Sequence, residues 1–119
     1  MKDEFTTILG ELQAMHDRKG LDYGTYVEPF ANVIAGADFA GLEPWVAAMI
    51  RAQDKMGRLS KAAHGHTLKV ETVDDNLVDL AVYAIIALCL YRRTHSHIDL
   101  KAVHPYLHVA EWPEPVSDD

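Results

Sequence analysis

Apolar residues recur at helical spacing along most of the chain and predict helices joined by short loops. In residues 5–15 they stand three and four positions apart, and a basic turn followed by Gly20 is typical of a helix end. A longer helix with an apolar face is expected over about 44–63, with a proline in its first turn. Between these two, the pattern predicts a short helix over about 29–36 and a loop over 38–43.

The most apolar predicted helix covers about 71–93. Thr72, or the glutamate before it, suits the N-cap position, and the acids that follow favour the positive end of the helix dipole. Beyond this helix the pattern weakens into a short helix over 98–109, cut by a proline, and an acidic tail over 111–119. No strand-like alternation is convincing. The sequence therefore predicts one all-α domain over 1–110, a small bundle of three to five helices.

Composition and charge narrow the range of functions. The chain is 49% hydrophobic and 24% charged, which is ordinary for a globular protein. Its net charge of −7 disfavours direct nucleic-acid binding and anionic membranes, but it leaves room for a small anionic ligand held through a cation. The first residues are acidic and lack an apolar stretch, so we expect no signal peptide, and the apolar run over 80–91 is shorter than the roughly 20 residues that span a bilayer. We therefore expect a soluble cytoplasmic protein.

Three carboxylates stand at the start of the most apolar helix. At about 100° per residue, Glu71, Asp75 and Asp79 fall at about 0°, 40° and 80° of rotation, so they share one face. Like charges four residues apart repel, and Val82 and Ile86 continue the face with apolar surface, so we expect a cation over the acids. Clustered carboxylates suit Mg²⁺ or Mn²⁺. The alternative is a dipole-stabilised helix start, with Asp79 paired to an arginine.

The preceding helix offers a basic face. Arg51, Asp54, Lys55 and Arg58 fall within about 100° of one another, with Lys61 just beyond. Basic side chains beside a carboxylate-bound metal suit a polyphosphate, because both neutralise phosphoryl oxygens. A solvated face with an Asp54–Arg58 pair is the alternative.

The loop "LDYG" is the third candidate element. Tyr23, beside a glycine, is suited to stack on a base, whereas an Asp22 turn bonded to its own backbone is the structural alternative. Asn32 is suited either to contact a base edge or to cap a turn. The sequence contains no GxSxG, P-loop or GxGxxG motif, which argues against the common serine-hydrolase and dinucleotide-binding classes.

Three short motifs, in order, resemble those of the nucleotide-modification-associated domain type 1 family of small phage and bacterial proteins. They are "RKGLDYG…F.N", "DKMGRL" and "ETVDDNLVDLAVYA", spread over roughly 18–86. More distantly, the chain is similar to the all-α nucleoside-triphosphate pyrophosphohydrolases, the MazG and dimeric dUTPase group. The resemblance implies a MazG-like helical bundle, usually a homodimer or homotetramer, that binds Mg²⁺ and a nucleotide between helices. MazG-type enzymes carry E-x-x-E on one helix, whereas "QDKMGR" here holds a single acid.

Together, the residues and the resemblance predict a metal-dependent nucleotide-binding protein that hydrolyses a (deoxy)nucleoside triphosphate to monophosphate and pyrophosphate. The expected catalytic residues are Asp54, Glu71, Asp75 and Asp79, the last three as Mg²⁺ or Mn²⁺ ligands, and the expected nucleotide-binding residues are Asp22, Tyr23, Asn32, Lys55, Arg58 and Tyr83. Two alternatives stay open: a non-catalytic nucleotide-binding or sequestering protein, and a structural helical oligomer whose acids pair with arginines.

Overall fold

The described part of the chain is helical throughout its regular structure. The computed structural model describes residues 3–22 and 30–95, so the predicted short helix after residue 97 and the tail lie outside it. Within these ranges there are four helices, α1 (Glu4–Asp22), α2 (Ala31–Ala40), α3 (Pro44–Ala63) and α4 (Val73–Thr94). Helices make up 82% of the described residues and no strand is present among them, which confirms the predicted all-α class.

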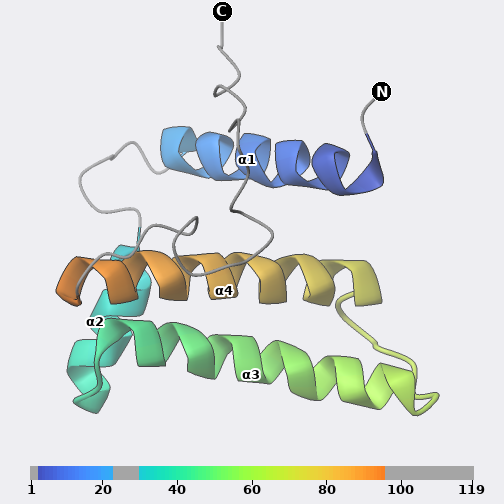
Figure 1. Cartoon of the computed structure of the whole chain (residues 1–119). Helices are drawn as coiled ribbons and strands as arrows, with labels where there is room; N and C mark the ends of the chain where they lie inside the picture. The colour runs from blue at the N-terminus through green and yellow to red at the C-terminus, as the bar shows by residue number, and fades with distance from the viewer. Residues whose placement is uncertain (1–2, 23–29, 96–119) are drawn as a thin grey trace, which may run out of the picture.

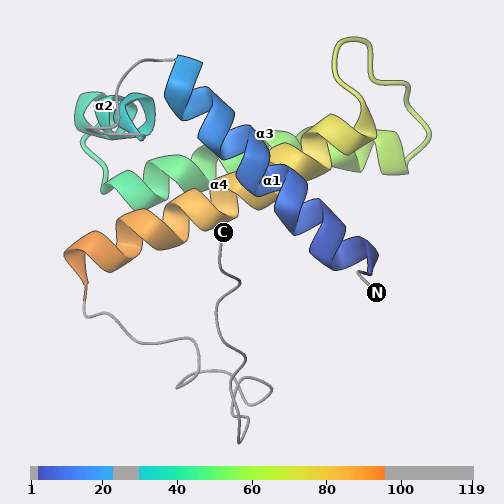
Figure 2. The ribbon, with the colours of Figure 1, turned by 90° about the horizontal axis from the view of Figure 1, so that it is seen from above.

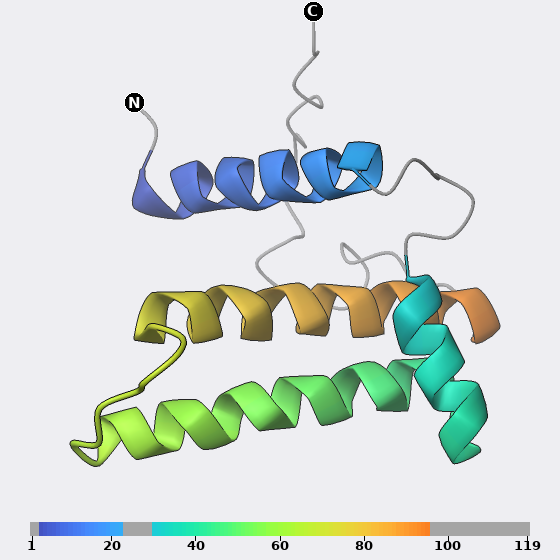
Figure 3. The same ribbon diagram turned by 180° about the vertical axis from the view of Figure 1, so that it is seen from behind.

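The helices stack around an antiparallel pair. Helices α3 and α4 run side by side in opposite directions, and α2 crosses the end of the pair at which α3 begins (Figures 1 and 3). Helix α1 lies over α4 on the side away from α3, and Figure 2 shows that it crosses the pair obliquely. The closest packing of the described residues runs between α3 and α4 and between α2 and α3.

A small apolar core joins α2, α3 and α4. Its buried members are Val33, Ala48, Ala87 and Leu90, with Phe30, Ile34, Trp45, Ala47 and Ile86 packed around them. The Trp45 ring meets Tyr91 edge-on, with 5.5 Å between centroids, a favourable aromatic geometry. These residues come from α2 and the residue before it, from the start of α3 and from the second half of α4. The opposite end of the pair, where α3 ends and α4 begins, is therefore left to charged side chains.

Helix α2 is longer than its sequence pattern predicts. It continues through Gly36 to Ala40, so the predicted loop over 38–43 was wrong in its first half. Val33 and Ala37 are both buried, and this packing extends the helix past a glycine that costs only about 1 kcal/mol in a helix interior. The helix ends at Gly41, whose φ of 70° is left-handed and whose N–H donates to the carbonyl of Asp38.

Helix α4 begins with a reciprocal cap. The Thr72 hydroxyl accepts the Asp75 backbone N–H at 3.0 Å, and the Asp75 carboxylate accepts the Thr72 N–H at 3.1 Å. Asn76 is fully buried one residue later, and its amide donates to the Thr72 carbonyl at 2.8 Å. These contacts fix the helix start at Val73, two residues after the predicted start at Glu71.

Among the described residues, no single helix is long and apolar enough to cross a membrane. Helices α2 and α3, bent by 101° at their junction, reach that length and apolarity only when taken together.

Candidate functional site

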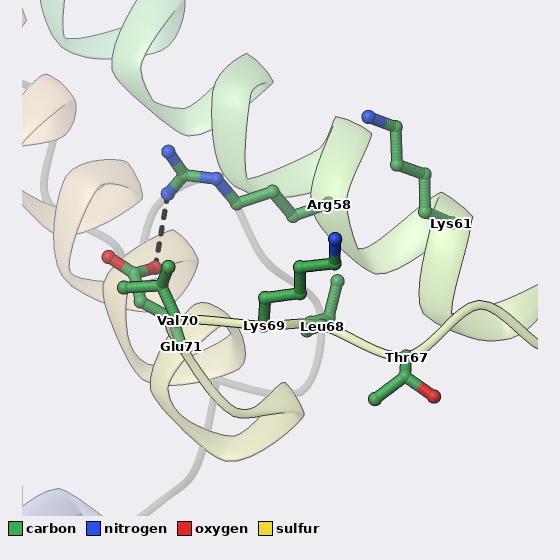
Figure 4. A pocket seen from close by; sticks show the side chains of 7 residues that line it. All are labelled: Arg58, Lys61, Thr67, Leu68, Lys69, Val70 and Glu71. Carbon is green, nitrogen blue, oxygen red and sulfur yellow. Dashed lines mark hydrogen bonds and ion pairs between the residues drawn. The ribbon is translucent and has the colours of Figure 1, made fainter.

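Four charged side chains meet where α3 ends and α4 begins. The Lys55 ammonium lies 3.3 Å from Glu71 Oε2 and 3.1 Å from Asp79 Oδ2. The Arg58 guanidinium donates to the same Glu71 oxygen at 3.0 Å, the contact drawn in Figure 4. Lys55 and Arg58 come from α3, Glu71 from the loop before α4, and Asp79 from the second turn of α4. We call Lys55, Arg58, Glu71 and Asp79 the charge cluster.

Lys55 is the least exposed member of the charge cluster. Its side chain is 13% exposed, compared with 35% for Glu71, 37% for Asp79 and 48% for Arg58. Burial lowers the pKa of Lys55, but hydrogen bonds and charge attraction from Asp79 and Glu71 outweigh this effect, and the pKa of Lys55 is raised overall. The Lys55 side chain is therefore an ammonium at neutral pH and compensates the negative charge of the two acids.

Asp75 does not join the charge cluster. Its Oδ2 accepts hydrogen bonds from the Thr72 N–H at 3.1 Å and the Thr72 hydroxyl at 2.9 Å. These two bonds, the backbone bond first, lower the pKa of Asp75. The expected stacking of Glu71, Asp75 and Asp79 required all three to be helical, whereas α4 begins only at Val73. The three carboxylates consequently do not converge on one point.

This arrangement does not fit a metal ion held by the protein alone. The described ranges contain no group of three or more histidine, cysteine, aspartate or glutamate side chains able to hold a metal. Glu71 and Asp79 do come together, but an ammonium already lies between them. Binding of Mg²⁺ or Mn²⁺ by Glu71, Asp75 and Asp79 stays a prediction.

A pocket of about 370 Å³ opens beside the charge cluster (Figure 4). Its lining side chains come from the last turns of α3 and from the loop before α4: Arg58, Lys61, Thr67, Leu68, Lys69, Val70 and Glu71. Three of them are cationic, and the one acid, Glu71, is already paired with Lys55 and Arg58. The pocket therefore offers positive charge in a protein whose net charge is −7.

Sequence reasoning assigned no role to Lys69. Helical spacing placed Lys61 beside Arg58, but Lys69 lies in the loop that returns to α4, where no periodicity links it to α3. The one indication in the sequence that Lys69 lies near the site is its position two residues before Glu71.

The predicted residues of α2, α3 and α4 outside the charge cluster do not meet at the pocket. Asn32 is exposed on α2, and its backbone carbonyl accepts a 3.5 Å bond from Arg51, near the start of α3. Asp54 is exposed on α3, and Tyr83 is half-buried on α4, one turn beyond Asp79. None of these three lines the pocket.

The predicted base-stacking loop around Tyr23 falls outside the described residues. Asp22 is the last residue of α1, and its side chain, like the whole of Tyr23 and Gly24, lies outside the described residues. Base stacking by Tyr23 stays a prediction.

The fold and the site define a small all-α protein with a charge cluster and a cationic pocket at one end of its central helix pair. Comparison with known proteins gives no match: no family model, curated protein or solved structure is significantly similar to the chain. What the protein does is therefore inferred from these side chains, and the family resemblance stays an expectation.

Proposed function

We propose that the protein binds a nucleotide, with the phosphates held in the pocket beside the charge cluster. The observation that carries this proposal is the lining of the pocket, in which Arg58, Lys61 and Lys69 surround a space of about 370 Å³. Pockets that hold small ligands start at roughly this size. These positive side chains, of which Arg58 is shared with Glu71, attract an anionic group, and phosphates are among the anionic groups that arginine and lysine bind.

The charge cluster supports this proposal by removing the acid that would repel phosphates. Glu71 lines the pocket, but its carboxylate is bound by Lys55 and Arg58. Thr67 adds an uncharged residue to the lining. Mg²⁺ or Mn²⁺, which prefers substrate phosphates together with few protein ligands, would enter bound to the nucleotide.

Hydrolysis to a monophosphate and pyrophosphate is a second candidate function. It is favoured by the position of Glu71, because a carboxylate beside bound phosphates is suited to orient an attacking water. In this form of the proposal Lys55 and Arg58 hold the Glu71 carboxylate in place, and the cations of the pocket stabilise charge on the phosphates.

Ligand-induced thermal stabilisation tests the binding proposal. Deoxy- and ribonucleoside triphosphates are added with Mg²⁺, and a nucleotide at about 100 times its dissociation constant should stabilise the fold by about 2.7 kcal/mol. Lys61→Gln and Lys69→Gln should each weaken binding about fivefold, as expected for an exposed charge contact of about 1 kcal/mol. Arg92→Gln removes one positive charge from the end of α4, outside the pocket lining, and is the matched control. Absence of stabilisation by every nucleotide and by inorganic tripolyphosphate would refute the proposal.

Pyrophosphate release in the same samples separates the two candidate functions. Turnover that disappears in Glu71→Gln, while the thermal shift persists, supports the hydrolase. If the wild-type protein shows a thermal shift but releases no pyrophosphate, it binds nucleotides without hydrolysing them.

A further inference from the structure

Lys55 occupies the space that a bridging metal ion would need. Its ammonium contacts one oxygen of Glu71 and one of Asp79. Glu71 precedes the N-cap residue Thr72 in the sequence, and Asp79 follows it within α4. Lys55 is also the most buried of the three charged side chains. The positive charge between the two carboxylates therefore comes from α3 and belongs to the folded chain.

A divalent ion and this ammonium cannot lie between the same two oxygens. Mg²⁺ approaches carboxylate oxygens to about 2.0–2.1 Å, and the Lys55 nitrogen lies 3.3 and 3.1 Å from these two oxygens, so an ion bound to both would lie within about 5 Å of the ammonium and be repelled by it. A third carboxylate would strengthen metal binding, but the Asp75 carboxylate is already hydrogen-bonded to Thr72. Arg58 further competes for the Glu71 oxygen.

We infer that Lys55 is the resident cation of the Glu71–Asp79 pair, and that the protein without nucleotide holds no Mg²⁺ or Mn²⁺ between these carboxylates. The two carboxylates thus form a cation site that is filled by a side chain of α3. If the ammonium charge is removed, a divalent ion should be able to bind between Glu71 and Asp79. This inference does not depend on nucleotide binding, because it concerns the free protein.

Mn²⁺ binding measured by electron paramagnetic resonance, without nucleotide, tests the inference. Lys55→Gln should bind Mn²⁺ at least about tenfold more tightly than the wild-type protein, because a repelling charge within about 5 Å of the ion has been removed. Arg92→Gln, which removes one positive charge from the last turn of α4, at the far end of that helix from Asp79, should leave Mn²⁺ binding as in the wild type. The double variant Lys55→Gln/Asp79→Asn should lose the gained site.

Two results overturn the inference. One is a wild-type Mn²⁺ site that disappears in Asp79→Asn, because the ammonium would then have given way to the metal. The other is a folded Lys55→Gln protein without tighter Mn²⁺ binding. If Lys55→Gln does not fold in metal-free buffer, circular dichroism with added Mn²⁺ decides: recovery of helical signal supports the inference, and no recovery contradicts it.

Discussion

At the scale of single residues, Asp75 and Asp79 show how the same side chain acquires different partners. They stand one turn apart on α4, yet Asp75 is bound by its sequence neighbour Thr72 and Asp79 by Lys55 of another helix. A carboxylate three residues after a threonine is a local capping pattern, so the sequence contains the first partner. The second partner depends on how α3 lies against α4.

Loss of the Thr72 hydroxyl should change both the stability of the fold and the titration of Asp75. Because hydrogen bonds from Thr72 lower the pKa of Asp75 below 3.8, ionised Asp75 stabilises the fold above that value, and this contribution is lost as pH falls through the lower folded pKa. Thr72→Ala should destabilise the protein by about 1 kcal/mol at neutral pH, the usual cost of losing an N-cap side chain. The loss should be smaller in acid, once Asp75 is protonated. In the variant, the pKa of Asp75 should rise toward 3.8.

Denaturant unfolding at neutral and at acid pH and an NMR titration of the Asp75 carboxyl group check this prediction. Thr72→Ser is the control, because it keeps the hydroxyl and should keep both the stability and the low pKa. A wild-type Asp75 that titrates at or above 3.8 would contradict it.

At the scale of elements, a glycine ends a helix here only where its backbone is left-handed. Gly36 and Gly57 lie inside α2 and α3, whereas Gly41 ends α2 with a φ of 70°. An added Cβ at either Gly41 or Gly57 would meet no atom within 4 Å. The difference between these two positions is therefore purely one of φ.

Alanine substitutions at Gly41 and Gly57 should have opposite effects. Gly57→Ala should stabilise the protein by about 1 kcal/mol, because alanine is the better helix former and the site has room for its methyl group. Gly41→Ala should destabilise it by about 1–2 kcal/mol, because the left-handed conformation strains a residue with a Cβ. Urea unfolding of the two variants measures both changes. A Gly41→Ala variant that is not destabilised would contradict the left-handed end of α2, and a destabilised Gly57→Ala variant would contradict the helix-propensity argument.

At the scale of the whole molecule, α4 presents an apolar face that no described helix buries. Its exposed apolar residues follow one another at intervals of four and three positions, as in a helix–helix seam. They are Leu77, Ala81, Ala84 and Leu88, with Ile85 beside them. On α1, the side chains of Phe5, Ile8 and Leu9 are also at least 48% exposed. A contiguous apolar surface of this kind is characteristic of an interface.

We expect a second copy of the chain to cover this face. Acidic Asp74 and Asp75 occupy the first turn of α4, and basic Arg92 and Arg93 occupy its last turn. An antiparallel pairing of two α4 helices would place each acidic start beside the partner's basic end, and the alanines between would allow close approach. The homodimer or homotetramer expected from sequence stays a prediction, with this surface as its contact.

Sedimentation velocity over a range of protein concentrations measures the assembly. Leu88→Glu should shift the protein to a monomer, because a carboxylate buried in an apolar interface costs several kcal/mol. Phe39→Glu is the control: Phe39 is 95% exposed and belongs to α2, not to α4, and its substitution should leave the assembly unchanged. A wild-type monomer at every concentration, or no effect of Leu88→Glu, would contradict the prediction.

The sequence by itself determined the helical class and the approximate extent of α3 and α4, and it narrowed the N-cap of α4 to Thr72 or Glu71, because these features depend on periodicity and on contacts within one turn. It also pointed to the basic side chains of α3 and the acids of α4 as the charged elements of the site. Only the tertiary structure decided their pairing. Lys55 reaches Glu71 and Asp79 because α3 and α4 pack antiparallel, and Lys69 faces the same pocket because the connecting loop turns back there. Such contacts join residues far apart along the chain, whose distances are set by packing and not by local spacing.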